Sequence, residues 1–427
     1  MSDAMYEVTR RQFIRTSATV AAGSLAVGTM TAQRGAHAAG SDAVRVGLIG
    51  CGGRGTGAAF NALEASSRVR VVALADVFAD RLDSCRMRLL EAGDRAVVAD
   101  EHCYTGFDAY RELLADDVDV VILATPPHFR PIHFAEAVDA GRHVFMEKPA
   151  AVDPTGIRVV LAAAAEAERR NLSVVAGTQR RHELSYQSAI KRIHGGLLGS
   201  VMAARCYWNM GGLWMHPRQP GWSDMEWQLR NWLYFTWLSG DHIVEQHVHN
   251  LDAINWVVGT HPVRALGLGG RQVRTDPAYG HIFDHFAVEY EYPNGVFLTS
   301  MCRQIDGCPG RVEEVVRGTH GTAILRSGHA VIECEDSWRF EGDNPNPYVQ
   351  EHRDLIDSID RGAGHNEARQ VAESTLTAIM GRMSAYTGQP VSWEQALDSS
   401  LDLSPDAYEF GDLPTPSVAI PGRTPLI

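Results

Sequence analysis

The stretch VRVGLIGCGGRG, residues 44–55, is an apolar run that leads directly into a glycine-rich turn. Val, Leu and Ile dominate residues 44–49, which predicts a short buried strand. The turn fits the spacing G-x-G-x-x-G, in which glycines permit a tight bend and let backbone N–H groups approach a pyrophosphate at a helix N-terminus. The stretch therefore predicts a dinucleotide-binding loop, and we assign its cofactor contacts to Gly50, Gly52, Gly53, Arg54 and Gly55.

The residues after this loop extend the same pattern. Residues 57–65 are typical of a helix, and VRVVALAD, residues 69–76, predicts a second buried strand that ends in Asp76. An acidic residue at this strand end can bind ribose hydroxyls and would repel a 2′-phosphate, so Asp76 favours NAD over NADP. The alternative is that Asp76 is a solvated acid in a turn.

The first half of the chain continues to alternate strands with helices. Three more strands and two helices are predicted, at 118–125, 143–147 and 171–177 and at 130–140 and 154–169, respectively. Such a βαβ series predicts a parallel sheet with right-handed crossovers. We therefore assign residues 44–177 to a Rossmann dinucleotide-binding domain.

The pattern changes after residue 177. Two alternating runs flank Asn294-Gly295, which is a strong hairpin signal, and two helices are predicted later, at 349–361 and 366–387. The fold class is thus α/β, with the Rossmann domain followed by an α+β domain, residues 178–395, that has an open, mainly antiparallel sheet. Residues 396–427 form a C-terminal tail.

A second motif, Glu147-Lys148-Pro149, lies at the end of the strand predicted at 143–147. With this motif the chain resembles the Gfo/Idh/MocA oxidoreductases, which include glucose–fructose oxidoreductase and inositol dehydrogenases, over about residues 44–395. The resemblance implies that Glu147 and Lys148 contact the cofactor, that Lys148 polarises the reacting hydroxyl, and that a cis peptide precedes Pro149. Without the resemblance, Lys148 is only a solvated lysine at a strand end.

The loop that follows the strand at 118–125 departs from the family pattern. The family often has T-P-N-x-x-H, whereas this chain has TPPHFR, residues 125–130, with Arg130 in the usual histidine position. We expect Thr125 to contact the cofactor and His128 to substitute for the missing histidine.

The segment SGDHIVEQHVHNLDAINWVVG, residues 239–259, aligns with the family's catalytic segment. Glu245, His249 and Asp252 are spaced i, i+4 and i+7, which places them on one face of a helix. We expect His249 to take the hydroxyl proton, and Glu245 to hold a substrate hydroxyl or assist the transfer. Asp252 either orients the imidazole or caps local structure.

His247 and His249 raise the question of a metal site. On a helix, residues i and i+2 face apart, so one metal does not readily bind both histidines together with Glu245. On an extended segment it could. We assign no metal.

Substrate contacts are predicted from two further stretches. Six of the nine tryptophans lie between residues 208 and 237, and aromatic faces pack well against sugar rings, so Trp232 is a candidate contact. GTQRRHE, residues 177–183, begins the second domain and adds Arg181 and His182, and Asp252 completes this set of candidates. The alternatives are a hydrophobic insertion that packs on the sheet or on a second subunit, and ordinary surface arginines.

Composition excludes several classes of partner. The net charge is −13, which argues against nucleic acid and against an anionic membrane surface. The seven cysteines are odd in number and show no C-x-x-C spacing, which argues against a disulfide framework or a zinc site. An open antiparallel sheet commonly pairs, so we expect a homo-oligomer.

The first 38 residues carry an export pattern. TRRQFIR, residues 9–15, has the order of a twin-arginine signal, residues 16–33 carry no charge, and Ala36-His37-Ala38 fits a cleavage site. Residues 1–38 are therefore predicted to be a removable signal that sends the folded protein to the periplasm, with no membrane association after processing. Twin-arginine export moves folded proteins, so NAD would be bound tightly before export.

Together these features predict an NAD-dependent oxidoreductase that acts on CH–OH groups of a sugar or a sugar-derived alcohol. The alternative is a redox-neutral glycosidase or lyase that works through a transient ketosugar. A non-catalytic sugar-binding or NAD-binding module is disfavoured, because Lys148, Glu245 and His249 occur together.

Overall fold

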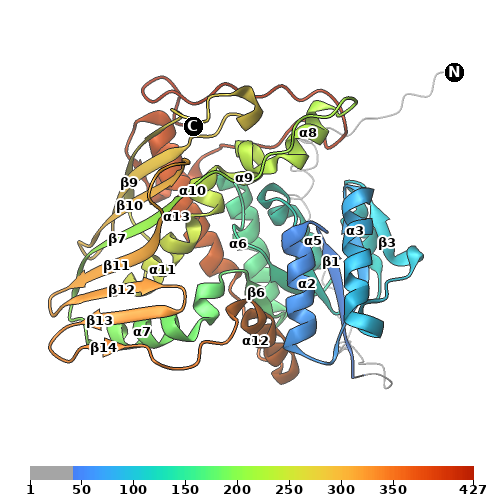
Figure 1. Cartoon of the computed structure of the whole chain (residues 1–427), viewed down its shortest axis with the longest axis horizontal. Helices are drawn as coiled ribbons and strands as arrows, with labels where there is room; N and C mark the ends of the chain where they lie inside the picture. Colours follow the sequence, from blue (N-terminus) through green and yellow to red (C-terminus); the bar gives the residue numbers. More distant parts are fainter. Residues whose placement is uncertain (1–41) are drawn as a thin grey trace, which may run out of the picture. The chain divides into compact units, whose positions relative to one another are not determined.

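The computed structural model describes residues 42–427, so the predicted export signal lies outside the described residues. The first sheet is parallel and has the order β3-β2-β1-β4-β5-β6. Its edge strands β3 and β6 lie on opposite sides of β1 in Figure 1. Its strands are β1 (Val44–Ile49), β2 (Val69–Asp76), β3 (Cys103–Thr105), β4 (Val120–Leu123), β5 (His143–Met146) and β6 (Val174–Ala176). The strand order reverses between β1 and β4, and parallel sheets of this kind bind ligands beyond the carboxyl ends of such strands.

Five helices connect these strands: α2 (Gly53–Ala65), α3 (Ala79–Leu89), α4 (Ala109–Ala115), α5 (Arg130–Asp139) and α6 (Pro154–Arg169). The start of α6 illustrates how local sequence sets a boundary. Asp153 accepts a hydrogen bond from the Gly156 backbone N–H, and Pro154 occupies the first turn, where its missing N–H is not needed. The predicted range 154–169 is therefore confirmed.

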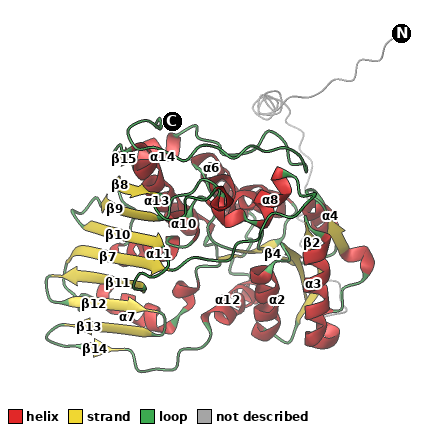
Figure 2. Cartoon of the chain, turned by 45° about the horizontal axis from the view of Figure 1, so that its top comes forward, coloured by secondary structure: helices red, strands yellow, loops and turns green. Residues whose placement is uncertain are grey.

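The second sheet has nine strands in the order β14-β13-β12-β11-β7-β10-β9-β8-β15 (Figure 2). These are β7 (Val201–Met210), β8 (Arg264–Gly270), β9 (His285–Glu291), β10 (Phe297–Gln304), β11 (Arg311–Gly318), β12 (Thr322–Arg326), β13 (His329–Glu333), β14 (Trp338–Arg339) and β15 (Val391–Ser392). Only the β7–β10 pair is parallel, and β9 and β10 form the predicted hairpin. The predicted fold class is confirmed.

Helices of the second half cover this sheet and also reach back to the first one. The long helices are α7 (Leu184–His194), α11 (Val248–Val258), α12 (Pro347–Arg361) and α13 (Ala368–Thr387), and the short ones are α8 (Asp224–Arg230), α9 (Thr236–Ser239), α10 (His242–Glu245) and α14 (Trp393–Asp398). α13 packs on β8 and on α6, whereas α12 packs on α2 and adds Leu355 and Ile356 to the core of the first sheet. The two sheets are thus joined through shared helices.

A separate apolar core connects three distant parts of the chain. Phe78 follows β2, Leu229 and Leu233 come from the segment after β7, and Tyr408 comes from the C-terminal tail. We call this the bridging core. Within residues 42–427, no helix is both long enough and apolar enough to cross a bilayer.

The glycine loop yields a stability prediction. A Cβ on Gly55 would lie 1.8 Å from the Gly50 carbonyl oxygen, so Gly55→Ala should lower the free energy of unfolding by about 1–3 kcal/mol or more. Gly57 lies in the same helix and its nearest neighbour would be 4.0 Å away, so Gly57→Ala should be neutral or stabilising by about 0.5–1 kcal/mol. Urea denaturation measures both, and equal effects would contradict the packing argument.

Candidate active site

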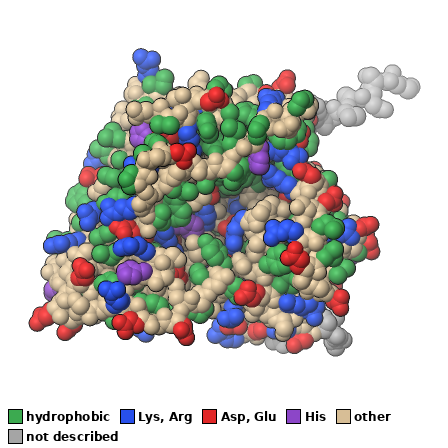
Figure 3. All heavy atoms as spheres, in the orientation of Figure 1, with side chains coloured by type: hydrophobic (Ala, Val, Ile, Leu, Met, Phe, Trp, Pro, Cys, Tyr) green, Lys and Arg blue, Asp and Glu red, His purple; other side chains and the backbone are tan. Residues whose placement is uncertain are grey.

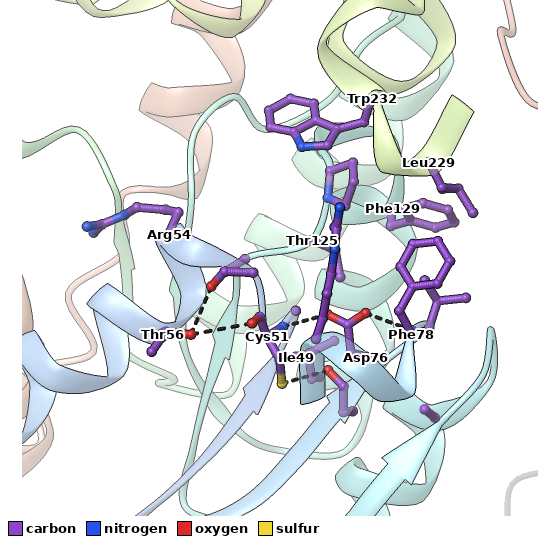
Figure 4. Close-up of a pocket in the computed structure, with 18 of the residues that line it drawn as sticks. Ile49, Cys51, Arg54, Thr56, Asp76, Phe78, Thr125, Phe129, Leu229 and Trp232 are labelled. Carbon is purple, nitrogen blue, oxygen red and sulfur yellow. Dashed lines mark hydrogen bonds between the residues drawn. The ribbon is translucent and has the colours of Figure 1, made fainter. Parts of the chain in front are cut away.

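A cavity of about 670 Å³ opens at the carboxyl ends of β1, β2 and β4 (Figure 4). Gly50 has φ of +101°, and a Cβ there would lie 2.6 Å from the Ala124 carbonyl carbon, so only glycine fits. A Cβ on Gly52 or Gly53, by contrast, would meet no atom within 4 Å. This free space beside backbone N–H groups at the start of α2 suits the phosphates of a dinucleotide.

Asp76 is buried and holds the glycine loop in place. Its Oδ2 accepts a hydrogen bond from the Cys51 backbone N–H at 2.7 Å, and its Oδ1 accepts one from the Phe78 backbone N–H at 2.9 Å. Burial raises the pKa of the Asp76 carboxyl, and these hydrogen bonds oppose the shift. Asp76 also lines the cavity, where its remaining lone pairs can accept hydrogen bonds from ribose hydroxyls. Arg81 lines the same cavity.

Arg54 extends away from Asp76 and Phe78 (Figure 4). Its guanidinium pairs with Glu147, and its Nη2 lies 3.2 Å from Oε1 of Glu351 on α12. Burial, and then the charge of Glu147, raises the pKa of Glu351 well above its usual range. Arg54 therefore links the glycine loop to the end of β5, next to Lys148.

The loop after β4 differs from its predicted arrangement. Thr125 lines the cavity as expected, but His128 does not, because its Nε2 lies 2.8 Å from the Tyr408 hydroxyl of the tail. The structure thus places His128 against the tail, and its contact with the cofactor stays a prediction. Arg130 is 1 % exposed and donates to the carbonyls of Leu123 and Thr125, so it stabilises this loop from behind.

His133 lines the cavity and was missed by the sequence analysis. Its Nδ1 lies 3.3 Å from the Thr125 hydroxyl. Burial and the nearby charge of Arg130 lower the pKa of His133 to about 3, so the ring is neutral. Its position in the first turn of α5, directly after the loop that follows β4, is the sequence signal that could have identified His133.

Lys148 and Glu245 meet between the two halves of the chain. Lys148 Nζ lies 2.9 Å from Glu245 Oε1 and also donates to the Glu245 backbone carbonyl. The peptide bond before Pro149 is cis. The two side chains are 11 % and 8 % exposed, and Glu245 Oε2 has no hydrogen-bond partner. One carboxylate oxygen therefore lacks the partner that a substrate hydroxyl can supply.

His249 lies in the first turn of α11, with its ring stacked on Trp208 at a centroid distance of 5.6 Å. Burial, and then the positive charge of Lys148, holds the pKa of His249 well below its usual range. Its Nδ1 has no hydrogen-bond partner. A neutral imidazole beside an ammonium group is suited to accept a proton from a hydroxyl that the ammonium polarises.

Asp252 does not contact His249. It forms a bidentate ion pair with Arg181 at 2.9 Å and accepts from the Ser374 hydroxyl at 2.7 Å. The role of Asp252 in orienting the imidazole is therefore not observed. Both Arg181 and Asp252 have their partners within the protein, where they join the start of the second domain to α11 and α13.

His182, the other predicted substrate contact in this stretch, is also engaged within the protein. It is 4 % exposed, with Nδ1 at 2.6 Å from Asp354 Oδ2 and Nε2 at 3.5 Å from Glu367 Oε1. Burial lowers the pKa of His182, but the hydrogen bond to Asp354 and the nearby carboxylate of Glu367 outweigh it and bring the value to about 10. His182 is thus a charged link between the first residues of the second domain and α12.

The two histidines of the catalytic segment point to different neighbours. His247 Nε2 lies 2.6 Å from the Ser300 hydroxyl on β10, whereas His249 faces Trp208. In the part of the chain that the structure describes, no group of three or more His, Cys, Asp or Glu side chains is arranged to hold a metal ion.

The tryptophans divide between two places. Trp214 and Trp232 line the cavity together with His216, so Trp232 lies on the dinucleotide side and not beside His249. Trp208 remains at the catalytic cluster, where its exposed portion can pack against a sugar ring. The space-filling view is hollowed between the parts built on the two sheets (Figure 3).

These features agree with comparisons to known proteins. Residues 44–175 match the GFO_IDH_MocA family model, an oxidoreductase family with an NAD-binding Rossmann fold. This match spans the strands and helices of the first sheet. Over a longer span, the chain is 23% identical over 386 residues to inositol 2-dehydrogenase of Acidothermus cellulolyticus, which covers 90% of this chain and 97% of that relative.

Two curated relatives and one solved structure illustrate the similarity. The chain is 27% identical over 245 residues to 2,7-anhydro-N-acetylneuraminate hydratase of Escherichia coli and 31% identical over 163 residues to inositol 2-dehydrogenase 4 of Saccharopolyspora erythraea. These alignments cover 57% and 38% of this chain and 60% and 44% of the two relatives. The fold also matches aldose-aldose oxidoreductase of Caulobacter crescentus, with a TM-score of 0.65, 19% identity and coverage of 82% of this chain and 99% of that one.

The interior ion pair of His182 gives a pH-dependent prediction. Because the pKa is about 10 in the folded protein and about 6.5 when unfolded, the stabilisation is complete below pH 6.5 and is lost as pH rises toward 10. The loss of unfolding free energy in His182→Gln should therefore be largest near pH 6 and should shrink toward pH 9.5. His320→Gln, at an exposed site, serves as the control. A loss independent of pH would contradict the assignment.

Proposed function

We propose that this protein is an NAD-dependent oxidoreductase that acts on a sugar or a sugar-derived alcohol. The observation that carries the proposal is the cluster of Lys148, Glu245 and His249, which the Arg54–Glu147 ion pair connects to the glycine loop. A nicotinamide, when bound, supplies the hydride acceptor. The inositol dehydrogenase relative supports the choice of a polyol or sugar substrate.

Lys148, Glu245 and His249 have separate roles in the oxidation of a secondary alcohol. Lys148 donates a hydrogen bond to the hydroxyl oxygen and polarises it, while Glu245 fixes the ammonium group and accepts from a neighbouring hydroxyl. His249, neutral because of burial, takes the hydroxyl proton as the C–H bond gives up its hydride. The products are a carbonyl, a reduced nicotinamide and a protonated imidazole, so charge and electrons balance.

The proposed cofactor is NAD rather than NADP. Asp76 lies where the ribose of the adenosine half would sit, and a carboxylate there repels a 2′-phosphate. Arg81, on the same wall, is the residue that would favour NADP. Tighter binding of NADPH than of NADH in a direct titration would overturn this choice.

Export and assembly complete the proposal. Residues 1–38 would direct the folded protein to the periplasm, and cell fractionation tests this. The outer face of the second sheet carries four exposed apolar side chains on β8 and β10: Leu266, Leu268, Phe297 and Met301. Leu268 and Met301 share one row across the sheet, opposite Ala287 of β9. An exposed apolar stripe of this kind suits a second copy of the chain.

Assembly through this face gives a testable prediction. The purified protein should have the mass of a dimer or a larger oligomer, and Leu268→Glu should shift it toward the monomer by placing a charge in the interface. Light scattering measures both masses. Leu90→Glu, at an exposed site on the first domain, should leave the mass unchanged. A monomeric wild type would contradict the proposed assembly.

The catalytic assignment predicts the outcome of a labelled assay. Sugars and cyclitols deuterated at each CH–OH carbon should transfer the label to the nicotinamide, and Lys148→Met and His249→Asn should lower kcat by about 10²–10⁴-fold. The matched control is Lys191→Met, at an exposed position on α7. Wild-type activity in both site variants would refute the assignment.

A redox-neutral reaction is the second candidate, because one relative is a hydratase of an anhydro sugar. In that case the hydride returns to the substrate after elimination or addition at a neighbouring carbon. The labelled assay would then show no net reduced nicotinamide, while solvent deuterium would enter beside the oxidised carbon.

A further inference from the structure

We infer that the segment after β7 and the C-terminal tail form a clasp over the adenosine half of the nucleotide site and retain the dinucleotide between turnovers. The clasp consists of residues 211–235 and 403–413. This inference rests on the proposed function, because it concerns the same nucleotide. The sequence predicts tight binding only through the export argument, whereas the structure points to the residues that would cause it.

The walls of the cavity come from both halves of the chain. Asp76 identifies the adenosine end, because an acidic residue at the end of the second strand binds that ribose. Trp214, His216, Leu229 and Trp232 line the same cavity from the clasp side. In Figure 4, Trp232 and Leu229 lie on the far side of the cavity from Cys51. An adenine that enters here is covered by aromatic rings of the second domain.

A polar contact fastens the clasp to the first domain. Arg230 at the end of α8 forms a bidentate pair with Asp80 of α3, with both N–O distances at 3.0 Å. The same guanidinium lies 4.0 Å from the centre of the Phe78 ring and 4.9 Å from that of Trp222. Because Asp80 is 63% exposed, the ion pair alone contributes little, and its role is to set the position of α8.

The bridging core contributes more than this ion pair to the stability of the clasp on the first domain. Phe78, Leu229 and Leu233 are almost fully buried there, and they would be exposed if α8 moved away from α3. The tail also contacts this core, since the ring of Phe410 stacks on Phe78 at a centroid distance of 5.9 Å and lies tilted against Phe107 at 5.3 Å.

Hydrogen bonds join the tail to α8 itself. The Gln228 side chain donates to the Leu413 carbonyl at 2.6 Å, and the Leu413 backbone N–H donates to Asp224 at 3.2 Å. The tail and α8 therefore move as one unit, so opening the cavity on this side costs burial of the whole bridging core.

The catalytic cluster does not share this enclosure. Lys148, Glu245 and His249 are absent from the walls of the cavity. The clasp therefore lies over the adenosine half of the nucleotide site and not over the cluster at His249. Nucleotide exchange should consequently be slower than substrate exchange.

The rate of nucleotide release tests this inference. The purified protein is loaded with NADH and mixed with excess ADP-ribose, and release is followed by the loss of bound NADH fluorescence. We expect Trp214→Ala and Trp232→Ala to release NADH at least about tenfold faster than wild type, and to bind ADP-ribose more weakly by a similar factor. Trp338→Ala on β14, where the ring packs against Arg192, is the matched control and should behave as wild type.

Milder variants guard against loss of folding. Arg230→Gln and Asp80→Asn change partly exposed groups, and each should speed release severalfold in the same direction. Release from wild type that is as fast as from Trp232→Ala would overturn the clasp and leave the proposed function intact. A wild-type protein that binds no NADH would overturn both.

Discussion

The buried ion pair between Lys148 and Glu245 is the contact on which the arrangement of the site depends. Lys148 follows β5 of the first sheet and Glu245 ends α10 of the second half, so the pair fixes the distance between the two domains. Removing one partner would leave an uncompensated charge in a buried position, which typically costs about 3–5 kcal/mol. The pair thus holds the polarising ammonium group next to His249.

A chain of contacts carries this constraint to the nucleotide site. Glu147, next to Lys148, pairs with Arg54 of the glycine loop, and Arg54 also contacts Glu351 of α12. Asp76 holds the other side of the same loop through the Cys51 N–H. The position of the glycine loop is therefore fixed by two groups of charged residues, one next to Lys148 and one at the ribose end of the nucleotide site.

The parts of the site that the sequence predicted are those determined by local pattern. The glycine loop, Asp76 at a strand end and the hairpin at Asn294-Gly295 each depend on a few consecutive residues. The position of Lys148 came from the resemblance to a family, because a lysine at a strand end has no local signature of its own.

The parts that the sequence did not predict depend on partners far along the chain. Asp252 pairs with Arg181, which lies 71 residues away, and His128 bonds Tyr408, which lies 280 residues away. Helical spacing placed Asp252 on the same helical face as His249, but it could not predict which residue would pair with the Asp252 carboxylate. The tryptophan-rich segment was a candidate for substrate binding or for hydrophobic packing, and only the fold shows that Trp232 lies on the nucleotide side.

A crystal structure with NAD and a bound polyol tests the central claim most directly. Nicotinamide C4 and the hydroxyl-bearing carbon should lie about 3–3.5 Å apart, with the hydroxyl within hydrogen-bond distance of Lys148 and His249. A nicotinamide bound away from Lys148, or a polyol whose hydroxyl contacts neither residue, would contradict it.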